Sequence, residues 1–189
     1  MVISQKETNV DEQSTHVSSP HSIVLYCSSP PNKAVQDSHF LSLPFHFCCT
    51  LPQRWEQYRR PMPQRWVEHA CELAVQLGAS TGNLLVNYDL HYANVLMGKR
   101  EPWLVVDPKV VIGDPEFGIA QLLWCRLEDI EVQGGLDRHF RILVEAAIVD
   151  PVRARSWTLV RCVDYWLWAV SVGLTHDPAR CEAIVNWLL

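Results

Sequence analysis

The sequence predicts an α+β fold that is mostly helical and contains a small β-hairpin element. Two patterns predict it: short apolar strands separated by turns lie between residues 84 and 106, and helical periodicity dominates after residue 114. The composition supports a packed core, because 48% of the residues are hydrophobic and 20% are charged. The length of 189 residues suits one ordinary domain, or one domain with a tail.

The chain divides near residue 50 into two parts of different composition. Residues 1–50 are rich in Ser, His, Pro and Thr and keep neither helical nor strand periodicity, so we expect an irregular or disordered segment there. The histidines and cysteines of this segment match no common zinc-binding spacing, and no metal site is predicted from them. Residues 51–189 hold the periodic patterns and are expected to form the folded lobe.

The predicted lobe begins with one helix, which three short strands follow. The helix is predicted over Gln64–Ala79, where apolar residues recur on one face and Gly78 provides a stop. The strands are predicted at Leu84–Val86, Val95–Met97 and Trp103–Val106. A long polar loop separates the first two strands, and a charged turn separates the last two.

Helices account for the rest of the chain. Four are predicted, at 115–127, 133–149, 152–172 and 178–189. Asp150 and Asp177 each precede a proline, which is the pattern of an N-cap followed by proline at the first helical position. The third helix has an apolar stripe that includes Trp157, Val163 and Leu167. This spacing favours a core helix over an aromatic ligand-binding surface.

Charge and hydropathy exclude several classes of function. The net charge of −5 argues against broad electrostatic binding to nucleic acid or to an anionic membrane. The sequence has no apolar run long enough to span a bilayer, and its first residues lack the basic and apolar regions of a secretory signal. The seven cysteines include no CxxC pair and are interpreted as reduced thiols. We therefore expect a cytoplasmic protein without nucleic-acid or membrane partners.

The polar loop between the first two strands carries the residues with catalytic potential. Asp89 and Asn94 lie five residues apart in the run NYDLHYANVL. A carboxylate can orient a hydroxyl group and receive its proton, and an amide oxygen can help to hold Mg²⁺ on phosphate groups. These are the two requirements of phosphoryl transfer to a hydroxyl.

A third candidate ends the last strand. Asp107 follows the run WLVV, 13 residues after Asn94, and is placed to bridge Mg²⁺ to phosphate oxygens. Each of these residues alone is common in turns. The combined order of strand, DxHxxN loop, strand, turn, strand and Asp is more specific, and it favours a phosphotransferase.

The runs NYDLHYANVL, PWLVVDPK and GDPEF resemble the aminoglycoside phosphotransferase superfamily, and most of all its streptomycin 6-kinase and hydroxyurea phosphotransferase group. The resemblance covers residues 51–189 and implies the C-terminal lobe of a protein-kinase-like fold. The loop of that superfamily usually reads HGDxHxxN, and Asn87 and Tyr88 stand here at the His-Gly positions.

The resemblance also implies roles for individual residues. Asp89 would be the catalytic base, and Asn94 and Asp107 would be the metal ligands. His91 would brace the loop by hydrogen bonding, and Asp114 would tie the following helix to the loop. The implied cofactors are ATP and Mg²⁺, and the implied partner is a small hydroxylated substrate such as streptomycin or hydroxyurea. Residues that bind the nucleotide base are not identified.

The N-terminal lobe of such kinases is not found in the sequence. No glycine precedes Gly78, and Lys6 and Lys33 are the only lysines of residues 1–50, so neither a glycine-rich phosphate loop nor an anchoring lysine on an apolar strand is present there. We expect a truncated family member, from a misplaced start or a gene remnant, with weak or absent catalysis. The alternative is a catalytically silent helical binding module.

The acceptor is not chosen by the sequence. Four acidic residues could face a cationic aminoglycoside, although such groups are more typical of a solvated helix end. They are Glu116, Glu128, Asp129 and Glu131. Hydroxyurea is much smaller and would need no acidic wall.

Overall fold

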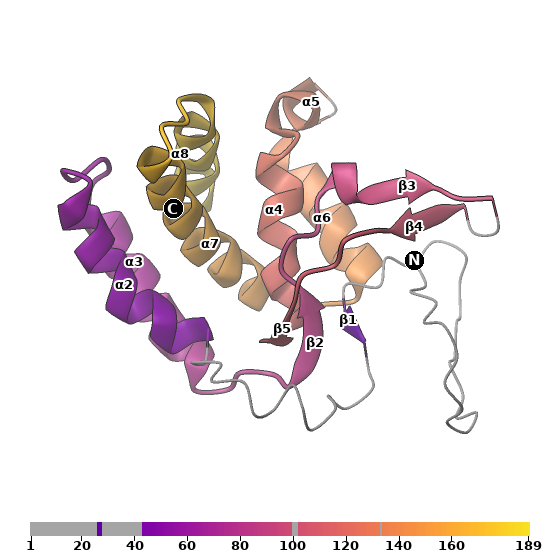
Figure 1. The fold of residues 1–189 in the computed structure, drawn as a ribbon, viewed down its shortest axis with the longest axis horizontal. Helices are drawn as coiled ribbons and strands as arrows, with labels where there is room; N and C mark the ends of the chain where they lie inside the picture. The colour runs from indigo at the N-terminus through magenta and orange to yellow at the C-terminus, as the bar shows by residue number, and fades with distance from the viewer. Residues whose placement is uncertain (1–25, 28–42, 100–101, 133) are drawn as a thin grey trace.

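The computed structural model describes residues 26–27, 43–99, 102–132 and 134–189. Helices form most of it, and the strands lie together on one side, with one hairpin projecting from the body (Figure 1). The predicted class, α+β and mostly helical, is confirmed. No helix among the residues just given is both long and apolar enough to cross a membrane.

The helical body is organised around the longest helix. The helices are α2 (Leu43–Gln57), α3 (Gln64–Gly78), α4 (Ile119–Trp124), α5 (Leu127–Val132), α6 (Gly135–Ala147), α7 (Pro151–Ser171) and α8 (His176–Leu188). Helix α7 packs against α2, α3, α4 and α8, so it lies at the centre of the core (Figure 1). The side chain of Trp157 is fully buried and the stripe that includes Val163 and Leu167 faces the core, which confirms the core helix that the periodicity predicts.

The strands form two small antiparallel sheets. One has the order β1 (Tyr26–Cys27), β2 (Leu84–Asn87) and β5 (Val110–Gly113). The other is the hairpin of β3 (Val95–Met97) and β4 (Trp103–Val105). Because β2 and β5 are neighbours, the segments that follow β2 and precede β5 emerge at the same end of the sheet. Those two segments carry the candidate catalytic residues.

Two predicted helix starts have different outcomes. Asp150 is the N-cap of α7, and its carboxylate accepts a hydrogen bond from the backbone N–H of Arg153 at 2.8 Å, as predicted. Asp177 is not an N-cap. Helix α8 begins at His176, two residues before the predicted start at Pro178, and Thr175 is its N-cap. Asp177 instead accepts a hydrogen bond from Arg180 within the first turn.

Two other predictions missed local structure. The single helix predicted at 115–127 is a 3₁₀ turn, η2 (Pro115–Gly118), followed by α4 and by α5, which starts only at Leu127. A turn at Cys125 and Arg126 interrupts the helical path, and the apolar periodicity alone does not reveal it. Strand β5 was not predicted, although its three β-branched residues favour a strand.

Helix α2 crosses the predicted boundary at residue 50. It begins at Leu43, so the irregular segment predicted for 1–50 is wrong for residues 43–50, and β1 is a second ordered part of that segment. Pro52 obscured the helix because proline normally breaks one. Pro52 has no N–H to donate to the carbonyl of Cys48, four residues earlier in the helix. The thiol of Cys71 lies 4.0 Å from that carbonyl oxygen and donates to it instead. The rest of 1–50 lies outside the described residues, and the division into two domains stays a prediction.

Candidate active site

Asn87 joins the two chain segments that carry the candidate site. This buried residue ends β2, and its side-chain Oδ1 accepts hydrogen bonds from the backbone N–H groups of Asp89, at 3.1 Å, and of Lys109, at 3.2 Å. A second backbone bond runs from the N–H of Tyr88 to the carbonyl of Lys109 at 2.9 Å. Asn87 stands at the histidine position of the family motif, and its amide fixes the loop to the segment before β5.

Both carboxylate oxygens of Asp89 are held by side chains from elsewhere in the chain. Oδ1 accepts a hydrogen bond from Nε2 of Gln121 at 2.9 Å, and Oδ2 accepts one from Nζ of Lys109 at 2.6 Å. Burial acts to raise the pKa of Asp89, but the hydrogen bonds from Lys109 and Gln121 outweigh it and hold the pKa below its usual value. Asp89 is therefore an ionised carboxylate with a fixed orientation.

Gln121 is in turn oriented by a buried arginine of α7. The guanidinium of Arg161 donates to Oε1 of Gln121 at 3.2 Å and to the carbonyl of Tyr88 at 3.3 Å. The same guanidinium lies over the ring of Phe117, 4.2 Å from its centroid. Because Oε1 is occupied by the arginine, the amide nitrogen of Gln121 is directed to Asp89. Helices α4 and α7 thus hold the loop of Asp89 through the side chains of Gln121 and Arg161.

Asn94 and Asp107 are brought together by the backbone. The carbonyl of Asn94 accepts the N–H of Val106 at 2.9 Å, and Asp107 is the next residue. The amide nitrogen of Asn94 donates to the carbonyl of Asp89 at 3.2 Å, which leaves its oxygen for another partner. Asp107 is exposed and has a φ of 48°, a left-handed conformation that non-glycine residues adopt rarely.

The donors at this place suit Mg²⁺. One carboxylate and one amide oxygen are hard ligands, and Mg²⁺ in phosphoryl-transfer sites is usually held by one or two carboxylates together with substrate phosphates and water. Among the residues that the structure describes, no group of three or more His, Cys, Asp or Glu side chains could hold a metal ion without such help. The chemistry of the Asp107 carboxylate and the Asn94 amide oxygen is compatible with Mg²⁺ held in this way.

The side chain of His91 makes no hydrogen bond within the described part of the chain, so the bracing role implied for it finds no support. Its backbone carbonyl does help to form the loop, because it accepts the N–H of Asn94 at 2.9 Å. The His91 ring is one of the smaller influences that lower the pKa of Asp89, after the hydrogen bonds from Lys109 and Gln121.

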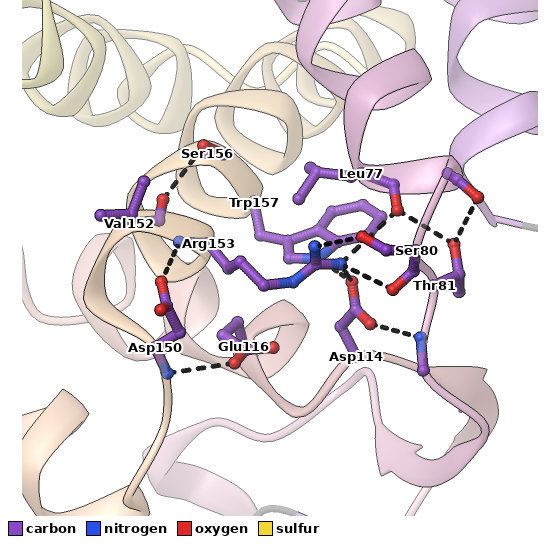
Figure 2. Close-up of polar contacts among 12 residues, drawn as sticks. Leu77, Ser80, Thr81, Asp114, Glu116, Asp150, Val152, Arg153, Ser156 and Trp157 are labelled. Atoms are coloured by element: carbon purple, nitrogen blue, oxygen red, sulfur yellow. Dashed lines mark hydrogen bonds and ion pairs between the residues drawn. The ribbon is translucent and has the colours of Figure 1, made fainter.

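Asp114 is a structural anchor at a different place from the one expected (Figure 2). It is only 3% exposed, and its carboxylate accepts hydrogen bonds from the N–H of Gly82 at 2.6 Å, from the indole of Trp157 at 2.7 Å and from the guanidinium of Arg153. These contacts join the end of β5 to the turn before β2 and to α7. They do not reach the loop of Asp89, so the predicted tie to that loop is wrong.

Three of the acidic residues that could face a cationic acceptor are engaged by other groups. Glu116 is buried and accepts the backbone N–H of Asp150 at 3.1 Å (Figure 2). Glu128 pairs with Arg180 at 2.7 Å, and Asp129 pairs with Arg126 at 2.6 Å; both pairs are on the surface. These three carboxylates are therefore not free to receive a cationic acceptor without breaking an existing contact.

Three members of the site were not singled out from the sequence. Lys109, Gln121 and Arg161 are far from Asp89 in the chain, at 20 to 72 residues, and only the fold brings them near it. Two of them left a signal, because Gln121 interrupts the apolar run IAQLLW of α4 and Arg161 lies within the buried stripe of α7. A polar residue on a core face needs a partner, and here the partners belong to the site.

Comparison with solved structures shows the fold. The choline kinase LicA from Streptococcus pneumoniae matches with a TM-score of 0.55 and 14% identity, over 77% of this chain and 54% of that one. The aminoglycoside phosphotransferase APH(4)-Ia, as a thermostable mutant, matches with a TM-score of 0.53 and 23% identity, over 75% of this chain and 51% of that one. The chain has the kinase-like fold of these proteins over about half of their length.

Sequence relatives point to one group within that fold. Streptomycin 6-kinase of Streptomyces griseus is 38% identical over 114 residues, which are 58% of this chain and 36% of the relative. Hydroxyurea phosphotransferase of Kitasatospora aureofaciens is 36% identical over 126 residues, which are 67% of this chain and 36% of the relative. The chain spans little more than a third of the length of these curated relatives.

The family profile described as aminoglycoside/hydroxyurea antibiotic resistance kinase matches residues 35–173, which is most of the chain. The match includes the loop of Asp89 and Asn94, the strand that ends before Asp107, and both polar residues that support the loop from α4 and α7. This chain belongs to the aminoglycoside/hydroxyurea antibiotic resistance kinase family.

Proposed function

We propose that this chain forms the acceptor-activating and metal-binding part of a phosphotransferase that moves the γ-phosphoryl group of ATP to a hydroxyl group of a small molecule. The observation that carries the proposal is the geometry of Asp89: its two carboxylate oxygens are held by the side chains of Gln121 and Lys109, and these bonds lower its pKa. Asn94 lies beside it on the same loop, and its carbonyl is bonded to the residue before Asp107.

Asp89 would act on the acceptor. Its carboxylate accepts a hydrogen bond from the acceptor hydroxyl and aims the oxygen at the γ-phosphorus. As the new O–P bond forms, the bond from the γ-phosphorus to the bridging oxygen of ATP breaks, ADP leaves, and the hydroxyl proton passes to Asp89. A carboxylate with a lowered pKa is a weak base, which suits a loose transition state in which the proton moves late.

Asn94 and Asp107 would hold Mg²⁺, through one amide oxygen and one carboxylate. Bound there, Mg²⁺ would neutralise negative charge on the phosphate groups. The left-handed backbone at Asp107 supports this role, because strained conformations of this kind persist where a functional geometry requires them.

We propose that the acceptor is a small hydroxylated molecule of the kind that the relatives' names indicate, such as streptomycin or hydroxyurea. The pairing of Glu128 with Arg180 weakens the idea of a free acidic wall for a cationic aminoglycoside. The proposed setting is the cytoplasm, where ATP is available, without nucleic-acid or membrane partners.

A second candidate is a catalytically silent module of the same lobe. The observation that favours it is the β3–β4 hairpin, which exposes large apolar side chains on both of its faces. They are Leu96, Met97, Trp103 and Leu104. Exposed apolar groups of this size usually have a covering partner.

Calorimetric titration of Mg-ATP into the purified chain tests the proposal. We expect binding that depends on the metal and that is weakened at least tenfold in an Asp107→Asn variant, because a metal ligand is lost. Asp89→Asn is the matched variant, and it should bind Mg-ATP but transfer no phosphoryl group to streptomycin or hydroxyurea. A folded chain that binds no nucleotide at millimolar concentration would favour the silent module.

A further inference from the structure

Lys109 occupies a fixed position beside Asp89. Both of its backbone groups are bonded to the segment that leads into the catalytic loop: its N–H to Oδ1 of Asn87 and its carbonyl to the N–H of Tyr88. Its side chain is 50% exposed, and its ammonium group lies 2.6 Å from Oδ2 of Asp89. The backbone is therefore rigidly placed, while the long side chain can move.

The two oxygens of Asp89 differ in how firmly they are held. Oδ1 is bonded to Gln121, which the buried Arg161 holds in place. Among the described residues, Oδ2 is bonded only to the half-exposed Lys109. A flexible, half-exposed lysine gives up a hydrogen bond to an incoming hydroxyl group more easily than a glutamine that a buried arginine holds in place. Oδ2 is therefore the oxygen better placed to exchange its partner for an acceptor hydroxyl.

We propose that Lys109 is a further catalytic residue, whose ammonium group leaves Asp89 when the acceptor binds and then contacts the phosphoryl group during its transfer. This inference rests on the proposed function. In a reactive arrangement the phosphorus lies about 3–3.5 Å from the attacking oxygen. A cation already bonded to the carboxylate that holds this oxygen can reach the equatorial oxygens of the phosphoryl group.

The charge of the lysine suits this position. Negative charge spreads over the three equatorial oxygens as the phosphoryl group passes between its donor and its acceptor, and a fixed cation stabilises that distribution. Lys109 stays protonated throughout, and the hydroxyl proton goes to Asp89. Lysine supplies a compact charge on a flexible stem, which allows it to change partners within one cycle.

A purely structural role explains the arrangement less well. Asp89 is already fixed by Gln121 and by the backbone bond to Asn87, so the lysine is not needed to orient it. An ion pair with a half-exposed lysine contributes little to folding stability. The contact between Lys109 and Asp89 is better explained as the resting position of an ammonium group that contacts the phosphoryl group during its transfer.

The test compares two nucleotides that differ in the γ-phosphoryl group. The full chain and its Lys109→Ala variant are titrated with Mg-AMP-PNP and with Mg-ADP, in one series with saturating streptomycin and in a second series with saturating hydroxyurea. We expect the variant to bind Mg-AMP-PNP about 10- to 100-fold more weakly, which is the range for a charge-assisted hydrogen bond, and Mg-ADP within about twofold of the original affinity. Lys109→Arg should keep part of the preference, because it keeps the charge.

Two controls separate this role from damage to the fold. Lys99→Ala removes the same charge from the turn between β3 and β4, and it should leave both affinities unchanged. Lys109→Met keeps the length of the side chain but removes its charge, so it should lose the preference for Mg-AMP-PNP as Lys109→Ala does. Its thermal unfolding transition should be the same as that of the unmodified chain.

The outcomes distinguish this inference from the proposed function. If the unmodified chain binds both nucleotides and the Lys109→Ala variant keeps the same preference, or weakens both equally, the role of Lys109 is refuted and the proposed function stands. If the unmodified chain binds neither nucleotide, the proposed function fails and the role of Lys109 fails with it.

Discussion

Arg161 and Gln121 form a hydrogen bond of 3.2 Å between the central helix and the short helix α4, and this bond decides which end of the glutamine amide faces Asp89. The glutamine oxygen accepts from the arginine, so the amide nitrogen is left to donate to the carboxylate. The loop of Asp89 is thereby connected to α7, the helix that packs against α2, α3, α4 and α8. We therefore expect substitution of Gln121 to change mainly the rate of the proposed phosphoryl transfer, and substitution of Arg161 to change mainly the free energy of unfolding.

The first prediction concerns Gln121. A Gln121→Leu variant removes the donor to Oδ1 of Asp89 and leaves the carboxylate with only the half-exposed Lys109 as a side-chain partner among the described residues. If Asp89 is the base, as proposed, a misplaced carboxylate loses most of its contribution, so we expect phosphoryl transfer to slow by about 10- to 100-fold while Mg-ATP affinity stays within about twofold. Steady-state kinetics and calorimetry on the same preparation check this. Gln76→Leu, on the exposed face of α3, is the matched control, and an equal effect of both variants would contradict the prediction.

The second prediction concerns the stability that Arg161 provides. An Arg161→Met variant keeps the aliphatic stem but removes the guanidinium, so the carbonyl of Tyr88 and the oxygen of Gln121 lose their donors and the stacking over Phe117 is lost. We expect the free energy of unfolding to fall by about 2–3 kcal/mol. Urea unfolding followed by tryptophan fluorescence measures it.

Arg155 offers a comparison on the same helix. Its guanidinium lies over the ring of Trp187, 4.5 Å from the centroid, but makes no contact with the loop of Asp89. Arg155→Met should lower the free energy of unfolding by about 1 kcal/mol or less. An Arg161→Met variant no less stable than this one would show that the buried guanidinium is not supporting the fold.

The third prediction concerns the anchor at Asp114. An Asp114→Asn variant leaves the guanidinium of Arg153 without its anion and turns an amide N–H toward groups that are themselves donors, the indole of Trp157 among them. We expect a loss of about 3 kcal/mol, typical of breaking a buried ion pair. The N-cap variant Asp150→Ala, which loses one cap bond, should lose only about 1 kcal/mol. Thermal unfolding that ranks the two variants in the reverse order would refute this.

The sequence predicts well those features that depend on neighbouring residues. The strands at Leu84–Val86 and Val95–Met97, the helix that begins at Gln64 and the cap at Asp150 follow from apolar spacing and from local hydrogen bonding. The order of Asp89 and Asn94 within one loop is likewise a local property. These features can be predicted because their signals lie in neighbouring residues, although β2 finds its hydrogen-bonding partners only in the distant strands β1 and β5.

Features that depend on the fold could not be predicted in the same way. The partners of Asp114 come from the turn at Gly82 and from Trp157, 32 and 43 residues away, so its role depends on three elements meeting. The close approach of Asp114 also favours glycine at position 82, because a Cβ there would lie only 3.0 Å from Oδ1 of Asp114. The helix around Pro52 is similar, since packing against α3 stabilises a segment that local propensity disfavours.

The fourth prediction concerns acid sensitivity at His139. This residue of α6 meets the hydroxyl of Tyr92, on the 3₁₀ turn of the catalytic loop, with 3.0 Å between the ring Nε2 and the oxygen. Burial, together with the charge of Arg138, lowers the pKa of His139 from its ordinary value of 6.5. The folded chain therefore binds the proton more weakly than the unfolded chain does. The stability from the neutral ring is fully present above pH 6.5 and is lost as the pH falls through the lowered pKa.

A His139→Leu variant removes this titration. We expect the unfolding free energy of the unmodified chain to drop more steeply than that of the variant when the pH is lowered from about 7.5 to about 5.5, because only the unmodified chain carries the buried imidazole. Urea unfolding at both pH values gives the comparison. His69→Leu is the matched control, since His69 is a part-exposed histidine on α3, and it should keep the slope of the unmodified chain. If the unfolding free energy of His139→Leu falls with pH as steeply as that of His69→Leu, protonation of His139 is not the source of the acid sensitivity, and the prediction is wrong.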